Sequence, residues 1–142
     1  MRKSTKKQHS EGKVAGGLKV ADYMNPDVRS IHVERTLKDV CLMFRKWNVG
    51  SLLVDDGRRY IGIITERDLC RKAVAQGLDP SSTSVKDCMS KPVVSIEDDE
   101  PLLEAVKLMR DKGIRHIAVT EDNTIIGMLS VSDLLRHYSG VK

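Results

Sequence analysis

The chain has 142 residues, which is enough for one compact domain or two very small ones. Hydrophobic residues make up 40% and charged residues 31%, a composition that excludes a wholly disordered chain. The net charge of +4 lies entirely in residues 1–17, where five side chains are basic and one is acidic; residues 18–142 are neutral overall. A basic balance is typical of nucleic-acid-binding proteins, but this distribution confines the excess to a short arm.

Membrane insertion, secretion and disulfide bonding are not expected. No apolar run approaches the roughly 18 residues that a membrane-spanning helix needs, and no apolar stretch follows the basic start as in a secretory signal. The three cysteines include no Cys-x-x-Cys pair, which favours reduced thiols in a cytoplasmic protein over disulfides or a metal site. We expect Cys41 and Cys70 in the core, on helices, and Cys88 to be the exposed one.

The chain contains an internal duplication. Residues 1–17 lack hydrophobic periodicity and are expected to form a flexible basic arm. Beyond them, a shift of 65 residues places 20–71 on 85–136 without a gap, with 14 identities in 52 positions. Average composition would give about three by chance. The sequence therefore predicts two repeats, 18–76 and 85–142, joined by a linker at 77–84 that is marked by Gly, Pro and Ser.

Both repeats have the same order of hydrophobic patterns. In the first repeat these patterns predict a strand at 28–32, a helix at 36–47, strands at 51–54 and 60–65, and a helix from 66. In the second repeat they predict a strand at 93–97, a helix at 101–112, strands at 116–119 and 125–130, and a helix from 131. The fold class is therefore α+β, with two tandem β-α-β-β-α units. Since each unit alone is marginal in size, we expect them to pack through their sheets with pseudo-two-fold symmetry.

The sharpest repeated element is Gly62-Ile-Ile-Thr-Glu-Arg-Asp68, matched by Gly127-Met-Leu-Ser-Val-Ser-Asp133. A hydroxyl followed three residues later by an acid is a capping box, which stabilises a helix start without any ligand. The glycine inside an aliphatic strand is not explained by a cap, because glycine weakens a strand unless something approaches its backbone closely.

The same pattern also suits a nucleotide. The amide groups and the hydroxyl at a helix start can donate to phosphate. A carboxylate one turn later can accept hydrogen bonds from the two vicinal hydroxyls of a ribose. Phosphate donor, ribose acceptor and apolar walls together outline a nucleotide site.

The duplicated unit resembles the CBS domain, and the pair resembles a CBS-pair (Bateman) module over residues 18–138. The resemblance also rests on Val20-x-Asp22-x-Met24-Asn25-Pro26, on its counterpart Asp87-Cys88-Met89-Ser90-Lys91-Pro92 and on Gly113–Val119. It implies a regulatory module that binds adenosine-containing ligands, such as AMP, ADP, ATP or S-adenosylmethionine, in two clefts between the repeats. It also implies a homodimer and an effector protein that receives the signal.

By the same resemblance, motif position assigns residues to each cleft. In the first cleft, Thr65 and Arg67 would lie near phosphate and Asp68 on the ribose; Ile63, Val93 and Val94 would flank the base, and Arg115 and His116 would approach from the second repeat. The second cleft would use Val28, Met128, Ser130 and Asp133, with Gly50-Ser51 in the place of the two cations. We therefore expect the second cleft to be empty, weaker or suited to a less charged ligand.

Two other functions compete with a stand-alone sensor of energy or metabolite state. The basic arm could associate with nucleic acid through nonspecific phosphate contacts. Alternatively, the chain could be a structural dimerisation module with vestigial clefts. An enzyme is not expected, because no nucleophile–base pair, metal cluster or pair of carboxylates occurs at a useful spacing, so no catalytic cofactor is expected either.

Overall fold

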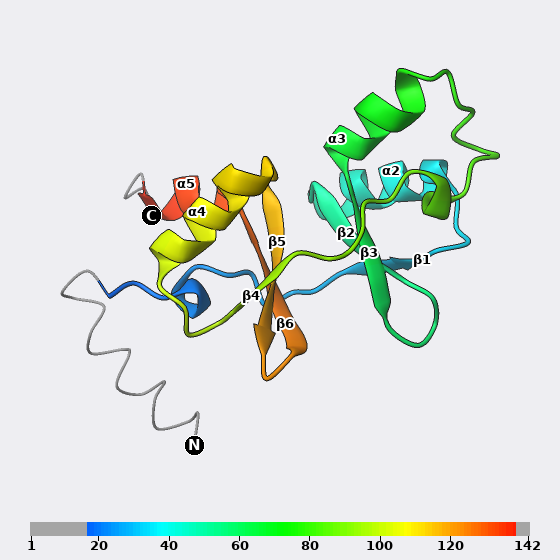
Figure 1. Cartoon of the computed structure of the whole chain (residues 1–142). Helices are drawn as coiled ribbons and strands as arrows, with labels where there is room; N and C mark the ends of the chain where they lie inside the picture. The colour runs from blue at the N-terminus through cyan, green and yellow to red at the C-terminus, as the bar shows by residue number, and fades with distance from the viewer. Residues whose placement is uncertain (1–16, 139–142) are drawn as a thin grey trace. The chain divides into compact units, whose positions relative to one another are not determined.

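The computed structural model of the chain describes residues 17–138, which form parts of two compact units (Figure 1). The first-repeat unit is Arg29–Val93, and the described part of the second-repeat unit combines residues 17–28 with residues 94–138. The expected arm at 1–17 lies outside the described residues except for Gly17.

The first-repeat unit contains one three-stranded sheet and its helices. Its main elements are β1 (Ser30–His32), α2 (Leu37–Trp47), β2 (Ser51–Asp55), β3 (Tyr60–Thr65), α3 (Glu66–Asp68) and a turn of π-helix, η3 (Leu69–Val74). The strand order is β1-β2-β3; β1 runs parallel to β2, and β2 runs antiparallel to β3. Helix α2 begins where the Thr36 hydroxyl accepts from the Asp39 amide, and it ends at Asn48, whose φ is 53°.

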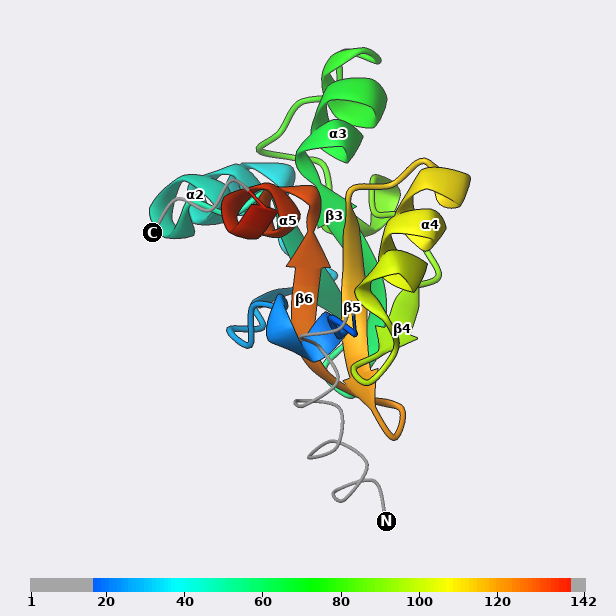
Figure 2. The same cartoon turned by 90° about the vertical axis from the view of Figure 1, so that its left-hand side faces the viewer.

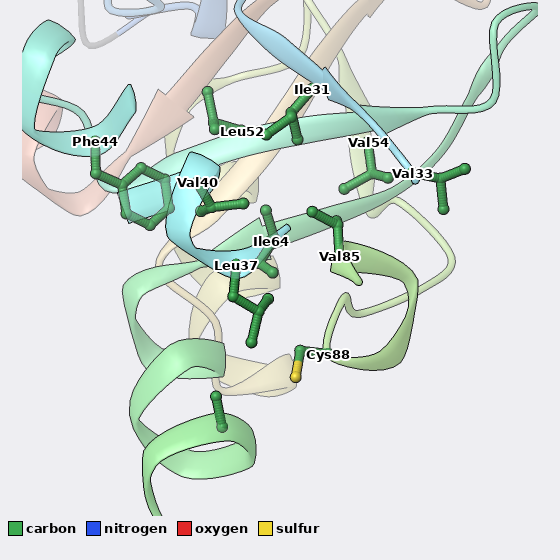
Figure 3. Close-up of a cluster of buried hydrophobic side chains, with 11 residues drawn as sticks. Ile31, Val33, Leu37, Val40, Phe44, Leu52, Val54, Ile64, Val85 and Cys88 are labelled. Carbon is green, nitrogen blue, oxygen red and sulfur yellow. The ribbon is translucent and has the colours of Figure 1, made fainter. Parts of the chain in front are cut away.

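An aliphatic core holds this unit together (Figure 3). Leu37, Val40 and Phe44 lie on one face of α2, at helical spacing, and pack against buried residues of the sheet. Two further core members, Val85 and Cys88, come from the segment after the first repeat and are 0% and 1% exposed. That segment therefore belongs physically to the first-repeat unit.

The second-repeat unit has the same plan (Figure 2). Its elements are η2 (Val20–Asp22), β4 (Ser95–Glu97), α4 (Leu102–Lys112), β5 (His116–Glu121), β6 (Thr124–Ser130) and α5 (Val131–Tyr138). The β5–β6 turn has positive φ at Asp122 (54°) and Asn123 (68°), as a tight two-residue hairpin requires. Val20 of η2 is fully buried in the core of this unit, among residues of α4, β5 and β6.

Each unit therefore includes the segment that precedes the other repeat's first strand. The short helix η4 (Val85–Asp87) lies in the first-repeat unit, whereas its sequence counterpart η2 lies in the second-repeat unit. The predicted linker at 77–84 is packed onto the start of α2, because the amides of Leu37 and Lys38 donate to the carbonyls of Thr83 and Pro80, both at 3.0 Å. The chain passes between the compact units after Val28 and after Val93 instead.

The predicted strands and helices all form, with ends that differ by no more than two residues. The prediction for the cysteines is wrong: Cys88 is buried, and Cys41 and Cys70 are exposed. Cys41 follows Val40 and so turns away from the buried face of α2, whereas Cys88 docks with its segment onto the core. Within residues 17–138, no helix has the length and apolar character needed to cross a bilayer.

Candidate ligand-binding site

Each unit positions one hydroxyl–carboxylate pair where a strand passes into a helix. Thr65 ends β3 and Asp68 lies in α3; Ser130 ends β6 and Asp133 lies in α5. The Thr65 amide donates to Asp68 Oδ2 at 3.0 Å, and the Asp68 amide donates to Thr65 Oγ1 at 3.2 Å. The Ser130–Asp133 bonds match, at 2.9 and 3.2 Å. Both pairs are therefore true capping boxes, as the first interpretation of the motif predicts.

The glycine of the motif makes room for the chain itself. A Cβ on Gly62 would lie 2.8 Å from the Ser90 carbonyl oxygen and 2.9 Å from Met89 Sδ. The Ile63 amide donates to that same carbonyl at 2.9 Å, and the Ser90 amide donates back to the Ile63 carbonyl at 2.8 Å. The close approach that the glycine predicts is therefore made by another segment of the chain, at Met89 and Ser90.

The second unit repeats this arrangement. A Cβ on Gly127 would lie 2.7 Å from Met24 Sδ and 2.9 Å from the Asn25 carbonyl oxygen. Asn25 and Met128 exchange two backbone hydrogen bonds of 2.7 and 2.9 Å. In both units, glycine permits a second stretch of chain to pair with the strand that leads to the carboxylate.

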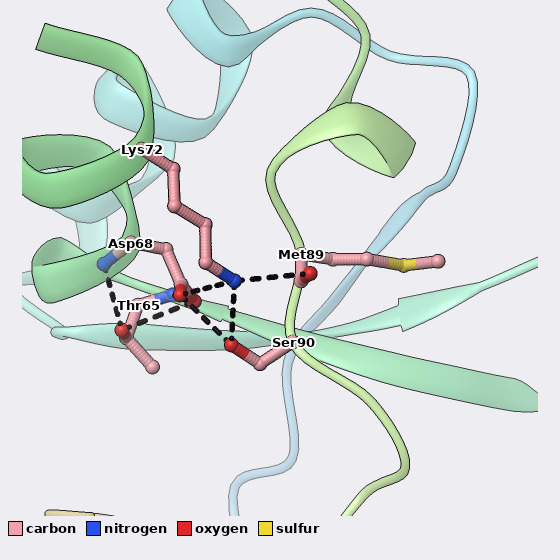
Figure 4. A network of polar contacts seen from close by, with 5 residues as sticks. All are labelled: Thr65, Asp68, Lys72, Met89 and Ser90. Atoms are coloured by element: carbon pink, nitrogen blue, oxygen red, sulfur yellow. Dashed lines mark hydrogen bonds and ion pairs between the residues drawn. The ribbon is translucent and has the colours of Figure 1, made fainter. Parts of the chain in front are cut away.

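Asp68 lies in a network that a cap alone does not require (Figure 4). Its side chain accepts from Thr65 Oγ1 at 3.2 Å and from Ser90 Oγ at 2.8 Å, and it is ion-paired with Lys72 Nζ at 3.1 Å. The Lys72 ammonium also donates to Ser90 Oγ at 3.1 Å and to the Met89 carbonyl at 3.4 Å. Asp68 is only 6% exposed, so these groups compensate a nearly buried charge.

Asp133 is equally buried, at 7% exposed, but its partners differ. Oδ2 accepts from Ser130 Oγ at 3.0 Å, and Oδ1 pairs with the guanidinium of Arg136. Arg136 lies three residues after its carboxylate, whereas Lys72 lies four residues after Asp68. The two sites thus share their capping geometry and differ in the cation.

The remaining residues predicted for the first cleft are divided between the units. Ile63, Arg67 and Val93 belong to the first-repeat unit; Ile63 is buried in β3 and Arg67 is exposed. Val94, Arg115 and His116 belong to the second-repeat unit. The composite first cleft stays a prediction.

Within the second-repeat unit, the two predicted cations adjoin the other pair. His116 is the strand partner of Ser130, and the Arg115 carbonyl accepts from the Val131 amide at 3.0 Å. The four residues predicted for the second cleft, Val28, Met128, Ser130 and Asp133, all belong to this unit.

Sequence reasoning missed Lys72 and Ser90. The spacing of Lys72, four residues after Asp68, is typical of an ion pair on a helix and could have identified it. Ser90 carried no such signal, because it is 22 residues from Asp68 in the chain.

Among the described residues, one acidic group could offer several oxygens to a cation. One ligand atom from each of Glu97, Asp98 and Asp99 lies within 4.8 Å of the others. Glu97 already accepts from the Thr120 hydroxyl at 2.6 Å and from the Asp122 amide at 3.2 Å. This group thus helps to fix the β5–β6 turn.

The duplicated fold agrees with the sequence matches. Residues 20–75 and 85–140 each match the CBS domain family, and the chain belongs to that family. It is 38% identical over 121 residues to a protein of Methanopyrus kandleri and 38% identical over 106 residues to the mitochondrial CBS domain-containing protein CBSX3 of Arabidopsis thaliana. The matches cover 84% and 71% of this chain, and 62% and 52% of those relatives.

Solved structures show the same architecture. A CBS-domain protein from Burkholderia ambifaria superimposes with a TM-score of 0.82 at 28% identity, covering 88% of this chain and 96% of that one. A hexameric CBS-CP12 protein from bloom-forming cyanobacteria gives 0.77 at 30% identity, covering 83% and 66%. A CBS domain pair solved in complex with 5′-methylthioadenosine and S-adenosyl-L-methionine gives 0.76 at 24% identity, covering 88% and 98%.

Proposed function

We propose that the chain is a regulatory CBS pair that binds an adenosine-containing ligand and passes energy or metabolite state to a partner protein. The observation that carries the proposal is the duplicated, nearly buried hydroxyl–carboxylate pair, Thr65–Asp68 and Ser130–Asp133. A buried carboxylate is costly, so one kept in both repeats at the same place favours a role beyond capping.

The roles follow from the chemistry of the side chains. Asp68 accepts hydrogen bonds from the ribose hydroxyls, and Thr65 and Arg67 lie on the phosphate side. Ile63, Val93 and Val94 form the apolar walls around the base, with Arg115 and His116 as further cations. In the second site, Asp133 binds the ribose, with Ser130, Met128 and Val28 around it. The complex of a CBS domain pair with 5′-methylthioadenosine and S-adenosyl-L-methionine indicates that this fold can hold adenosine compounds.

The proposal includes self-association, and it assigns the protein a binding role rather than a catalytic one. Three large apolar side chains are exposed on the described helices of the second-repeat unit: Leu103 and Val106 on α4, and Leu135 on α5. Because exposed apolar side chains favour a protein–protein interface, we expect a homodimer. Light scattering coupled to gel filtration would measure the molar mass in solution.

A thermal-shift panel tests the proposal directly. Wild-type protein is heated with AMP, ADP, ATP, NAD or S-adenosylmethionine at millimolar concentration. A ligand at 100 times its dissociation constant stabilises the folded state by about 2.7 kcal/mol, or roughly 5–11 °C for a chain of this size. No shift with any member of the panel would overturn the proposal and favour a structural module with vestigial clefts.

A further inference from the structure

The carboxylate of Asp68 has no acceptor position to spare. Its Oδ2 accepts from the amide and the hydroxyl of Thr65, while Oδ1 accepts from Ser90 Oγ and pairs with Lys72 Nζ (Figure 4). A carboxylate offers about four lone-pair positions, two on each oxygen. A ribose diol therefore reaches this carboxylate only by displacing existing partners.

A ligand can displace the partners of Oδ1 more easily than those of Oδ2. The Thr65 donors form the capping box that starts α3, so their loss would disturb the backbone. The hydroxyl of Ser90 can rotate while its backbone stays paired with Ile63. The Lys72 side chain is 40% exposed and carries its charge on a flexible four-carbon stem. Displacing Lys72 leaves a cation without its counter-ion.

We infer that Lys72 sets the charge specificity of the Asp68 site: it pairs with Asp68 until a nucleotide binds and then turns to the phosphate of that nucleotide. This inference rests on the proposed function. A neutral nucleoside takes Asp68 away from Lys72 and offers no anion in return, whereas a nucleotide supplies one. The Asp68 site therefore selects phosphorylated ligands over the corresponding nucleosides.

The second site takes its cation from a different position of the repeat. Oδ1 of Asp133 pairs with Arg136, and the position that corresponds to Lys72 in the repeat is His137. The ring of His137 packs edge to face on the ring of Tyr23, with 4.4 Å between the ring centroids. The lysine is therefore specific to the Asp68 site, and the inference concerns that site.

Calorimetric titration with AMP and with adenosine tests the inference. An Asp133→Asn background makes the titration report the Asp68 site. The variants are Lys72→Met, Lys72→Arg and the control Lys86→Met; Lys86 is an exposed lysine of the same unit that pairs with Glu34 at 3.7 Å. Thermal denaturation without ligand verifies that each variant is folded.

The ratio of the two affinities is the diagnostic quantity. We expect the parent to bind AMP about tenfold or more tightly than adenosine, and Lys72→Met to reduce that ratio to about threefold or less. Lys72→Arg should retain most of the preference, and Lys86→Met all of it. An unchanged ratio in Lys72→Met, with both ligands still bound, would overturn the inference alone. Failure of the wild-type protein to bind either AMP or adenosine would also overturn the inference, whereas the proposed function is overturned only if no member of the thermal-shift panel binds.

Discussion

At the scale of single residues, the glycine and the carboxylate of the motif have different roles in each unit: the glycine makes room for another segment of the chain, and the carboxylate is the candidate ligand-binding group. Gly62 admits the carbonyl of Ser90, which brings the Ser90 hydroxyl to Asp68. The glycine thus acts on the candidate site indirectly, by allowing a distant segment to deliver one of the carboxylate's partners.

Gly62→Ala should destabilise the protein by about 1–3 kcal/mol, because the new methyl group meets backbone that cannot move freely. The atom nearest to the new methyl group is a backbone carbonyl oxygen, at 2.8 Å, so repacking of side chains does not relieve the contact. Urea unfolding measures the loss, and hydrogen exchange locates it: the Ser90 amide, bonded to the Ile63 carbonyl, should exchange faster. Unchanged stability together with unchanged protection of Ser90 would contradict this account of the glycine.

At the scale of elements, α2 carries a capping box without a ligand site. Thr36 and Asp39 exchange the same two hydrogen bonds as Thr65 and Asp68. A hydrogen bond from the Arg35 side chain, at 2.9 Å, together with the Thr36 backbone amide, lowers the pKa of Asp39 to about 2. Because this carboxyl is more acidic in the folded chain, it stabilises the fold above its ordinary pKa, near 4, and loses that effect as the pH falls towards 2.

Asp39→Asn should therefore lower the free energy of unfolding at pH 7 by about 0.5–1 kcal/mol. The difference from wild type should shrink between pH 4 and pH 2, where the native carboxyl becomes protonated. Urea titrations at pH 7, 4 and 2.5 measure both effects. A difference that stays constant down to pH 2.5 would be inconsistent with the lowered pKa.

The thiols give a second prediction at this scale. Cys88 is 1% exposed, whereas Cys41 and Cys70 are exposed. Burial raises the pKa of the Cys88 thiol and also that of Cys41. Since the accessible thiolate is the reactive form, a thiol reagent such as Ellman's should modify Cys70 fastest, Cys41 more slowly and Cys88 only on unfolding. Fast modification of all three in native protein would disagree with the buried position of the 85–90 segment.

Sequence patterns predicted the elements well, because strand and helix periodicity and the capping boxes are local. They did not predict which segment packs on which sheet. Val85 and Val20 occupy equivalent positions in the repeat, yet each is buried with the other repeat's strands. This exchange of segments between the two repeats depends on contacts between residues far apart in the chain. The contact of Ser90 with Asp68 is of the same kind, so the sequence did not predict Ser90 as a site residue.

At the scale of the whole molecule, the compact units predict how fragments should behave. A fragment 18–76 follows the sequence repeat but lacks Val85 and Cys88, which are core residues of the first-repeat unit. A fragment 29–93 contains them. Each lost core side chain costs about 1.5–3 kcal/mol, which a unit of this size cannot spare. Circular dichroism and urea unfolding should therefore find 29–93 the more stable fragment; equal stability would argue against the exchange.

The central claim is that Asp68 binds the ligand rather than only capping α3. Calorimetric titration of the most stabilising ligand from the panel tests it in the Asp133→Asn background, where only the Asp68 site reports. The parent is compared with Asp68→Asn and Asp39→Asn, since both variants alter a Thr–x–x–Asp capping box. We predict that Asp68→Asn weakens binding about tenfold or more, because it removes charge-assisted hydrogen bonds to the ribose, whereas Asp39→Asn binds as the parent does. Parent affinity in folded Asp68→Asn protein would contradict the claim.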